Sequence, residues 1–234
     1  MSAAAASPTG FLATAAGAVE SFFLESAAAD PAAEATGPIE IRPVICVFGL
    51  AAGCGATVVA RALAAELALR DPAGTAVVCS GARPPGIPLA THAAKRLAGV
   101  LGDVPGAAPR GVGRLCLAGG DHERLIETAR YHAPVVSDAG FGALGGATAA
   151  TADRAVIVTT RGVEPALARV ASECVARVAP APVVVLNRAP HDQPGLFALP
   201  NSPVGARLAL GGREARGELG RAIAELADLI EEEL

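Results

Sequence analysis

The stretch "VICVFGLAAGCGATVVARAL", residues 44–63, decides the fold of this chain. Its first part is an uninterrupted apolar run that ends at Gly49, which is typical of a buried strand. A glycine-rich turn follows, and then a helix that we expect to continue to about Arg70. In such a unit, backbone N–H groups point into the turn and the helix N-terminus carries partial positive charge. Because Gly53 and Gly55 leave room for close approach, the stretch predicts a phosphate-binding loop.

The rest of the chain alternates between apolar runs and amphipathic segments. The expected strands lie within residues 74–81, 113–119, 133–140, 153–160, 181–188 and 195–200. The expected helices lie within residues 89–100, 121–131 (with Asp121 as N-cap), 164–178 and 217–234. Near-continuous apolar strands separated by helices predict an α/β fold, a mostly parallel, doubly wound sheet with helices on both faces. Right-handed crossovers then place the strand C-termini, and the loops that follow them, along one edge.

Composition excludes some classes of protein. The chain has 234 residues, of which 52% are apolar and 3% aromatic, and its net charge is −4. No global positive field therefore attracts nucleic acid or an anionic membrane. The five cysteines form no C-x-x-C pair and have no histidine at metal-ligand spacing. Most of them fall in apolar runs, where cysteine acts as a small hydrophobe, so we expect a reducing cytoplasm and no metal cluster.

The N-terminal part, residues 1–38, differs from the rest, which we expect to form one domain over residues 39–234. Small-residue, low-complexity segments flank a Phe-rich stretch at residues 11–24 with helical spacing. This stretch is too short to span a bilayer as a helix, and no positive charge before Arg42 marks a signal peptide. We expect a short helix that packs on the domain's own surface or binds a protein partner or a membrane surface.

Read as G-x-x-x-G-x-G, the glycines at 49, 53 and 55 have the spacing of short-chain dehydrogenases. Hydride transfer in that family needs a Tyr-x-x-x-Lys pair. The only tyrosine, Tyr131, is followed by His-Ala-Pro-Val, and the only lysine, Lys95, lies upstream of it. A dinucleotide-binding alternative of this kind therefore has no catalyst.

Read through Gly53 and Gly55, the loop resembles the deviant P-loop of the ParA/MinD family of P-loop NTPases. The family pattern is roughly K-G-G-V-G-K-T, and Thr57 matches its final threonine. Ala51 and Ala56 stand where its two lysines would be. Atypical relatives such as the TadZ/CpaE group carry similar "GG.GAT" loops.

Further segments match the family in order. In "PVVSDAGFG", Asp138 matches the magnesium-linked switch acid, and "VVVLNR" ends in Asn187, which matches an adenine-facing position. In "FALPNSPVGARLALGG", Pro200 belongs to a proline-containing turn that flanks the base in relatives. Each residue also has a plain structural alternative: Asp138 as a loop cap, Asn187 as a turn residue, and Thr57 as an ordinary helix start.

The resemblance implies a site for ATP or ADP with Mg²⁺. The expected nucleotide-binding residues are Gly53, Cys54, Gly55, Ala56, Thr57, Val58, Asn187, Arg188 and Pro200. The expected magnesium ligands are Thr57, whose hydroxyl would bind the ion as in other P-loops, and Asp138.

The missing lysines predict impaired chemistry. Loss of one charge-assisted phosphate contact weakens binding by about 1.5–3 kcal/mol. Hydrolysis suffers more, because electrostatic stabilisation is most of what a protein contributes to phosphoryl transfer. The second predicted strand is also followed by no carboxylate before Asp103. Arg83, in the loop after that strand, either supplies a replacement cation or is simply solvated. We expect little or no ATPase turnover.

The resemblance implies a homodimer that acts in positioning, partitioning or regulation through protein partners. The sequence shows neither a basic surface for DNA nor a basic C-terminal helix for membranes, since the chain ends in "EEEL". One alternative is a nucleotide-free interaction scaffold of the same fold. Another is a dethiobiotin-synthetase-like ligase, which fits poorly because those enzymes depend on the loop lysine.

Overall fold

The computed structural model describes residues 41–80, 89–119, 122–141, 151–179, 182–189, 195–232 and 234. Contacts divide the chain into two units, residues 1–39 and residues 40–234. The predictions made for residues 1–38, including the helix at residues 11–24, lie outside the described residues, as do those for Arg83 and Asp121.

The described residues form one eight-stranded sheet with the order β3-β4-β2-β5-β1-β6-β7-β8. The strands are β1 Val44–Gly49, β2 Ala76–Cys79, β3 Arg110–Val112, β4 Leu115–Ala118, β5 Val135–Phe141, β6 Arg154–Thr159, β7 Val183–Asn187 and β8 Phe197–Leu199. All paired strands are parallel except β3 with β4. The predicted mostly parallel sheet is confirmed.

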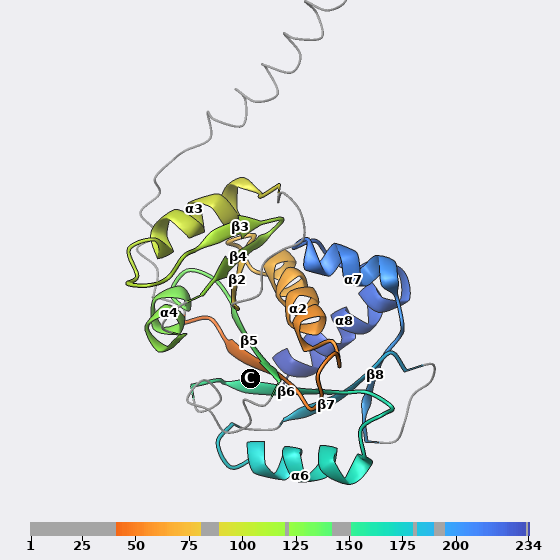
Figure 1. Cartoon of the computed structure of the whole chain (residues 1–234). Coiled ribbons are helices and arrows are strands. Elements are labelled where there is room, and N and C mark those ends of the chain that lie inside the picture. The colour runs from red at the N-terminus through yellow and green to blue at the C-terminus, as the bar shows by residue number, and fades with distance from the viewer. Residues whose placement is uncertain are drawn as a thin grey trace, which may run out of the picture. The chain divides into compact units, whose positions relative to one another are not determined.

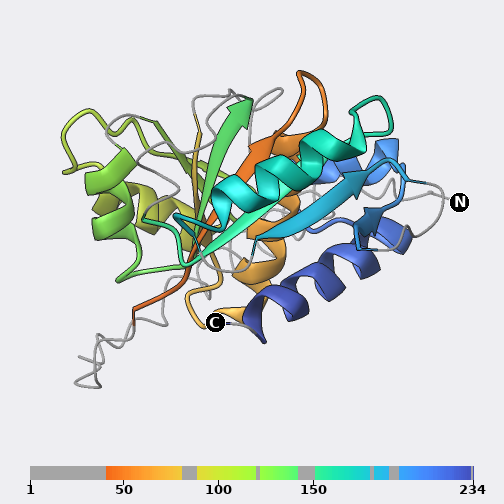
Figure 2. The ribbon, with the colours of Figure 1, turned by 90° about the horizontal axis from the view of Figure 1, so that it is seen from below.

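Helices cover both faces of this sheet, as predicted (Figure 1). They are α2 Ala56–Arg70, α3 His92–Leu101, α4 His122–Ala129, α6 Pro165–Val175, α7 Pro203–Leu210 and α8 Gly217–Glu231. One core cluster joins α2, α7 and α8 to the sheet, and the other joins α3, α4 and α6 to its opposite face. Seen from below, α6 and α8 lie on the two sides of β7 and β8 (Figure 2).

Strand β1 shows why the sheet is buried on both sides. All six of its residues are buried. Ile45 and Val47 enter the α2-side core, whereas Cys46 and Phe48 enter the other, as the alternation of a strand requires. An apolar run without polar interruptions is what such a strand needs.

Two elements were not predicted from the sequence. β3 is a short antiparallel edge strand, so its direction departs from the common strand direction that we expected. Helix α7 occupies the segment interpreted as a proline-containing turn. It begins at Pro203, a favourable first helical residue, and the Ser202 hydroxyl accepts a hydrogen bond from the Gly205 N–H at 3.1 Å.

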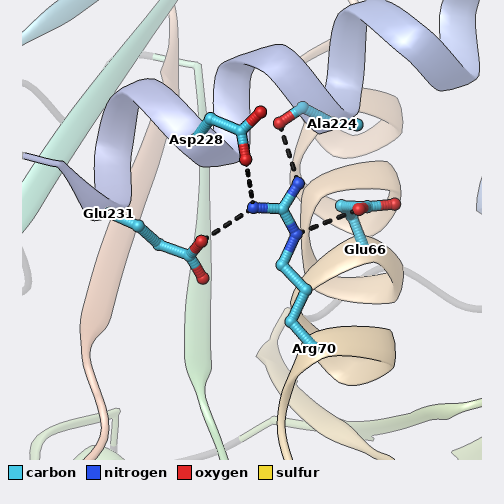
Figure 3. Close-up of polar contacts among 5 residues, drawn as sticks. All are labelled: Glu66, Arg70, Ala224, Asp228 and Glu231. Atoms are coloured by element: carbon cyan, nitrogen blue, oxygen red, sulfur yellow. Dashed lines mark hydrogen bonds and ion pairs between the residues drawn. The ribbon is translucent and has the colours of Figure 1, made fainter.

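The last turn of α2 is tied to α8 by Arg70 (Figure 3). Its Nε donates to Glu66 at 3.0 Å, and its Nη1 donates to Asp228 at 2.6 Å and to Glu231 at 2.7 Å. Nη2 donates to the Ala224 carbonyl at 2.9 Å. Burial lowers the pKa of Arg70, but the carboxylate partners more than offset this effect and raise the pKa above its ordinary value. The guanidinium therefore fixes one end of the helix whose other end forms the glycine loop.

Replacement of Arg70 by Gln should loosen this attachment. Because the Asp228 and Glu231 side chains are 61% and 41% exposed, solvent screens much of the attraction. We expect the free energy of unfolding to fall by about 1 kcal/mol, and by less in high salt. Urea unfolding at two salt concentrations measures this. An equal loss for Arg177→Gln, an exposed arginine on the segment after α6, would contradict the role given to Arg70.

Three cysteines lie in the core on the α3, α4 and α6 side. Cys46 on β1, Cys79 on β2 and Cys116 on β4 are fully buried, and burial raises the pKa of each thiol to about 12. They therefore stay protonated at neutral pH and act as small apolar side chains. Cys54 is buried as well, whereas Cys174 is exposed.

Thiol labelling tests this assignment. In the native protein at neutral pH, a maleimide should modify Cys174 alone within minutes, and all five cysteines should react in guanidinium. Mass spectrometry counts the labels. Fast native labelling of two or more thiols would show that the core thiols are accessible.

Candidate functional site

The glycine loop joins β1 to α2 at the C-terminal edge of the sheet. Gly53 and Gly55 have left-handed backbones, with φ angles of 73° and 93°. Gly55 is the N-cap residue of α2, and no side chain caps this end of the helix. Helix geometry leaves the first N–H groups of α2 without acceptors inside the helix. Small residues and open amides thus meet at the predicted position.

The two loop glycines differ in their surroundings. A Cβ added at Gly53 would meet nothing within 4 Å, so this part of the loop is open. A Cβ added at Gly55 would collide with the amide nitrogen of Asn187. Glycine is therefore required at position 55 for two reasons: its backbone is left-handed, and the Asn187 side chain occupies the space that a Cβ would need.

Asn187, the last residue of β7, holds the loop from the side. Its Nδ2 donates a 2.8 Å hydrogen bond to the Cys54 carbonyl, and its Oδ1 accepts one from the Arg188 N–H at 3.0 Å. The side chain is buried. The structure thus brings Asn187 to the loop, and its role beside an adenine base stays a prediction.

Two cavities adjoin near the start of α2 and the end of β7. One, of about 300 Å³, is lined by Ala51, Gly53, Cys54, Gly55, Ala56, Thr57, Val58, Gly140, Phe141 and Arg188. The other, of about 200 Å³, is lined by Val58, Val59, Ala62, Asn187, Arg188, Leu199, Pro200, Asn201, Ser202, Pro203, Ala206, Leu219 and Ile223. We call them the loop cavity and the apolar pocket. Val58 and Arg188 line both, so the cavities adjoin.

Asp138 lies on β5, next to β1, with its side chain buried. Its Oδ2 accepts a 3.0 Å hydrogen bond from the Ser80 hydroxyl, whereas its Oδ1 has no hydrogen-bond partner among the described residues. An unsatisfied buried carboxylate oxygen is costly unless something binds it. A cation would satisfy it.

Magnesium fits part of this arrangement. Thr57 lines the loop cavity, whereas Asp138 is not among the residues that line it. A threonine hydroxyl and a carboxylate are both oxygen ligands of the kind that Mg²⁺ prefers. Among the described residues, no group of three or more His, Cys, Asp or Glu side chains is placed to hold a metal. The ion would therefore take its other ligands from water and from phosphate.

Sequence reasoning missed a buried arginine near Asp138. Arg61 on α2 is fully buried, and its Nη1 donates to the Leu210 carbonyl at 2.9 Å. Burial lowers the pKa of Arg61, and the negative charge of Asp138 opposes this shift. Its position in the apolar helix, one turn after Thr57, was the only signal in the sequence. Ser80, the partner of Asp138, follows β2 directly and was also missed.

The sequence matches no protein-family model and no curated protein. Solved structures with the same fold do match. A ParA family ATPase from Chlorobium tepidum TLS has a TM-score of 0.54 and 16% identity, covering 80% of this chain and 98% of its own. The MinC:MinD cell division protein complex of Aquifex aeolicus gives 0.50 and 16%, with coverage of 81% and 96%. A plasmid partition protein from Borrelia burgdorferi gives 0.50 and 9%, with coverage of 83% and 100%.

The chain therefore has the ParA/MinD type of P-loop NTPase fold, as the sequence resemblance implied. At these identities the likeness establishes the fold alone. No helix in the described part of the chain has the length and apolar character needed to cross a membrane.

Two glycine variants test the geometry of the loop. Gly55→Ala combines a strained backbone with a collision against Asn187, so we expect it to lower the free energy of unfolding by about 3 kcal/mol or more. Gly74→Ala also places a side chain at a positive φ, +64°, but nothing lies within 4 Å of the new Cβ, so strain alone should cost it about 1–2 kcal/mol. Urea unfolding compares them. Equal losses would show that Asn187 does not occupy the place of a Gly55 side chain.

Proposed function

We propose that this protein is a ParA/MinD-like nucleotide-binding protein with weak or no ATP hydrolysis. The observation that carries the proposal is the junction of the loop cavity with the apolar pocket. One offers backbone amides, which suit phosphate, and the other offers apolar walls, which suit a base. A nucleotide needs both, side by side.

The ligand proposed is ATP or ADP with Mg²⁺. Amides of residues 53–58 would surround the phosphates, while Thr57 and Asp138 would hold the metal ion, whose chemistry is to neutralise phosphate charge. Pro200 and Asn187 would border the base in the apolar pocket. The 2.8 Å hydrogen bond from Asn187 to the Cys54 carbonyl supports the loop end of this scheme.

Weak hydrolysis is the expected effect of the alanines that stand at the two lysine positions of the glycine loop. Ala51 and Ala56 offer no charge to a transferring phosphoryl group. When one cation that contacts the transition state is missing, turnover falls by about a thousandfold or more. Such a protein would work by binding and releasing nucleotide rather than by rapid turnover.

We propose that this binding serves positioning, partitioning or regulation in the cytoplasm, through a homodimer and a protein partner. Residues 11–24 are the proposed partner-binding segment. The rival is a scaffold of the same fold whose loop holds no ligand. The two differ in whether nucleotide stabilises the protein.

Thermal unfolding with Mg-ADP, Mg-ATP and no nucleotide separates these hypotheses. Binding should raise the melting temperature progressively with ligand concentration, because a ligand of the native state stabilises it by RT ln(1 + [L]/Kd). Ala206→Phe should abolish this rise by filling the apolar pocket, whereas Ala166→Phe, on the exposed face of α6, should leave it intact. No rise at millimolar nucleotide in the folded wild type would favour the scaffold.

A further inference from the structure

Arg188, directly after β7, has an uncommon backbone conformation. Its φ of 59° is the only positive value among the described residues other than glycine. Left-handed geometry is unfavourable for a residue with a Cβ and persists where the surroundings enforce it.

Asn187 is hydrogen-bonded to this backbone. Its Oδ1 accepts the Arg188 N–H, and its Nδ2 holds the Cys54 carbonyl. The amide group can reach that carbonyl because Gly55 has no side chain. The conformation of Arg188 is therefore linked directly to the shape of the glycine loop.

This backbone brings the Arg188 side chain to the junction of the two cavities. Arg188 lines the loop cavity and the apolar pocket, and it is exposed. No hydrogen bond or ion pair engages its guanidinium within the described part of the chain. Among the described residues that line the loop cavity, it is the one charged side chain.

We propose that Arg188 is the phosphate-binding cation of this site. It takes over phosphate binding from the two family lysines, whose positions Ala51 and Ala56 occupy in this chain. The proposal rests on the proposed nucleotide-binding function and deepens it. An exposed guanidinium without a carboxylate partner can bind a phosphate through two parallel N–H donors. The ligand class it selects is a nucleoside phosphate, in preference to the free nucleoside.

A consequence concerns assembly. Because the cation belongs to the same chain as the loop, phosphate binding does not need a second subunit. The apparent dissociation constant for ADP should therefore stay constant as protein concentration varies across the dimerisation range.

Calorimetric titration of ADP and of adenosine into the wild type and five variants tests the assignment. Arg188→Gln should weaken ADP binding by about tenfold to a hundredfold, the loss of one charge-assisted contact, and leave adenosine binding unchanged. Arg188→Lys should retain part of the ADP affinity. Arg188→Gly should lose as much ADP affinity as Arg188→Gln. It should unfold at the same temperature as the wild type or at a higher one, because glycine tolerates positive φ. Arg177→Gln, also an exposed arginine, should match the wild type.

The outcomes separate this inference from the proposed function. If wild type binds ADP and Arg188→Gln binds it equally well, Arg188 is not the cation and nucleotide binding stands. The same conclusion follows if Arg83→Gln, and not Arg188→Gln, loses affinity. If wild type binds no ADP at millimolar concentration, the proposed function and this inference both fail.

Discussion

The hydrogen bond from Asn187 Nδ2 to the Cys54 carbonyl determines the shape of the site. It joins the end of β7 to the loop between β1 and α2, two segments that are 133 residues apart in the chain. It is possible because Gly55 leaves the space that the amide occupies. The same side chain binds the backbone of Arg188, so loop, strand end and arginine form one connected unit. Arg188 lines both cavities, whereas Cys54 and Gly55 line the loop cavity and Asn187 lines the apolar pocket.

Charge around this unit is sparse and unusually distributed. The loop itself carries none, Arg188 lies at the cavity junction, and Arg61 is buried in the core near Asp138. Backbone amides and a helix N-terminus still favour an anion without any lysine. Such a site can retain a nucleotide yet stabilise a transferring phosphoryl group poorly, because binding and catalysis depend on charge to different degrees. The attachment of α2 to α8 by Arg70 keeps the helix that presents those amides in place.

The fold could be predicted because its signals are local. Apolar runs such as residues 44–49 define buried strands, and the glycine spacing marks the turn that follows. The position of the loop at the sheet edge also followed from topology. The contact between Asn187 and Gly55 and the burial of Arg61 depend on elements that are distant in sequence. Local sequence patterns cannot predict such contacts. Helix α7 was missed because Pro203 suggests a turn as readily as a helix start, and only the Ser202 cap distinguishes them.

Backbone amide NMR of the loop during a titration with ADP tests the anion cradle most directly. The N–H signals of residues 53–58 should shift saturably, with the largest changes at the start of α2, and free adenosine should move them less. Signals that stay unchanged at millimolar ADP, in a protein that remains folded, would show that these amides do not bind phosphate.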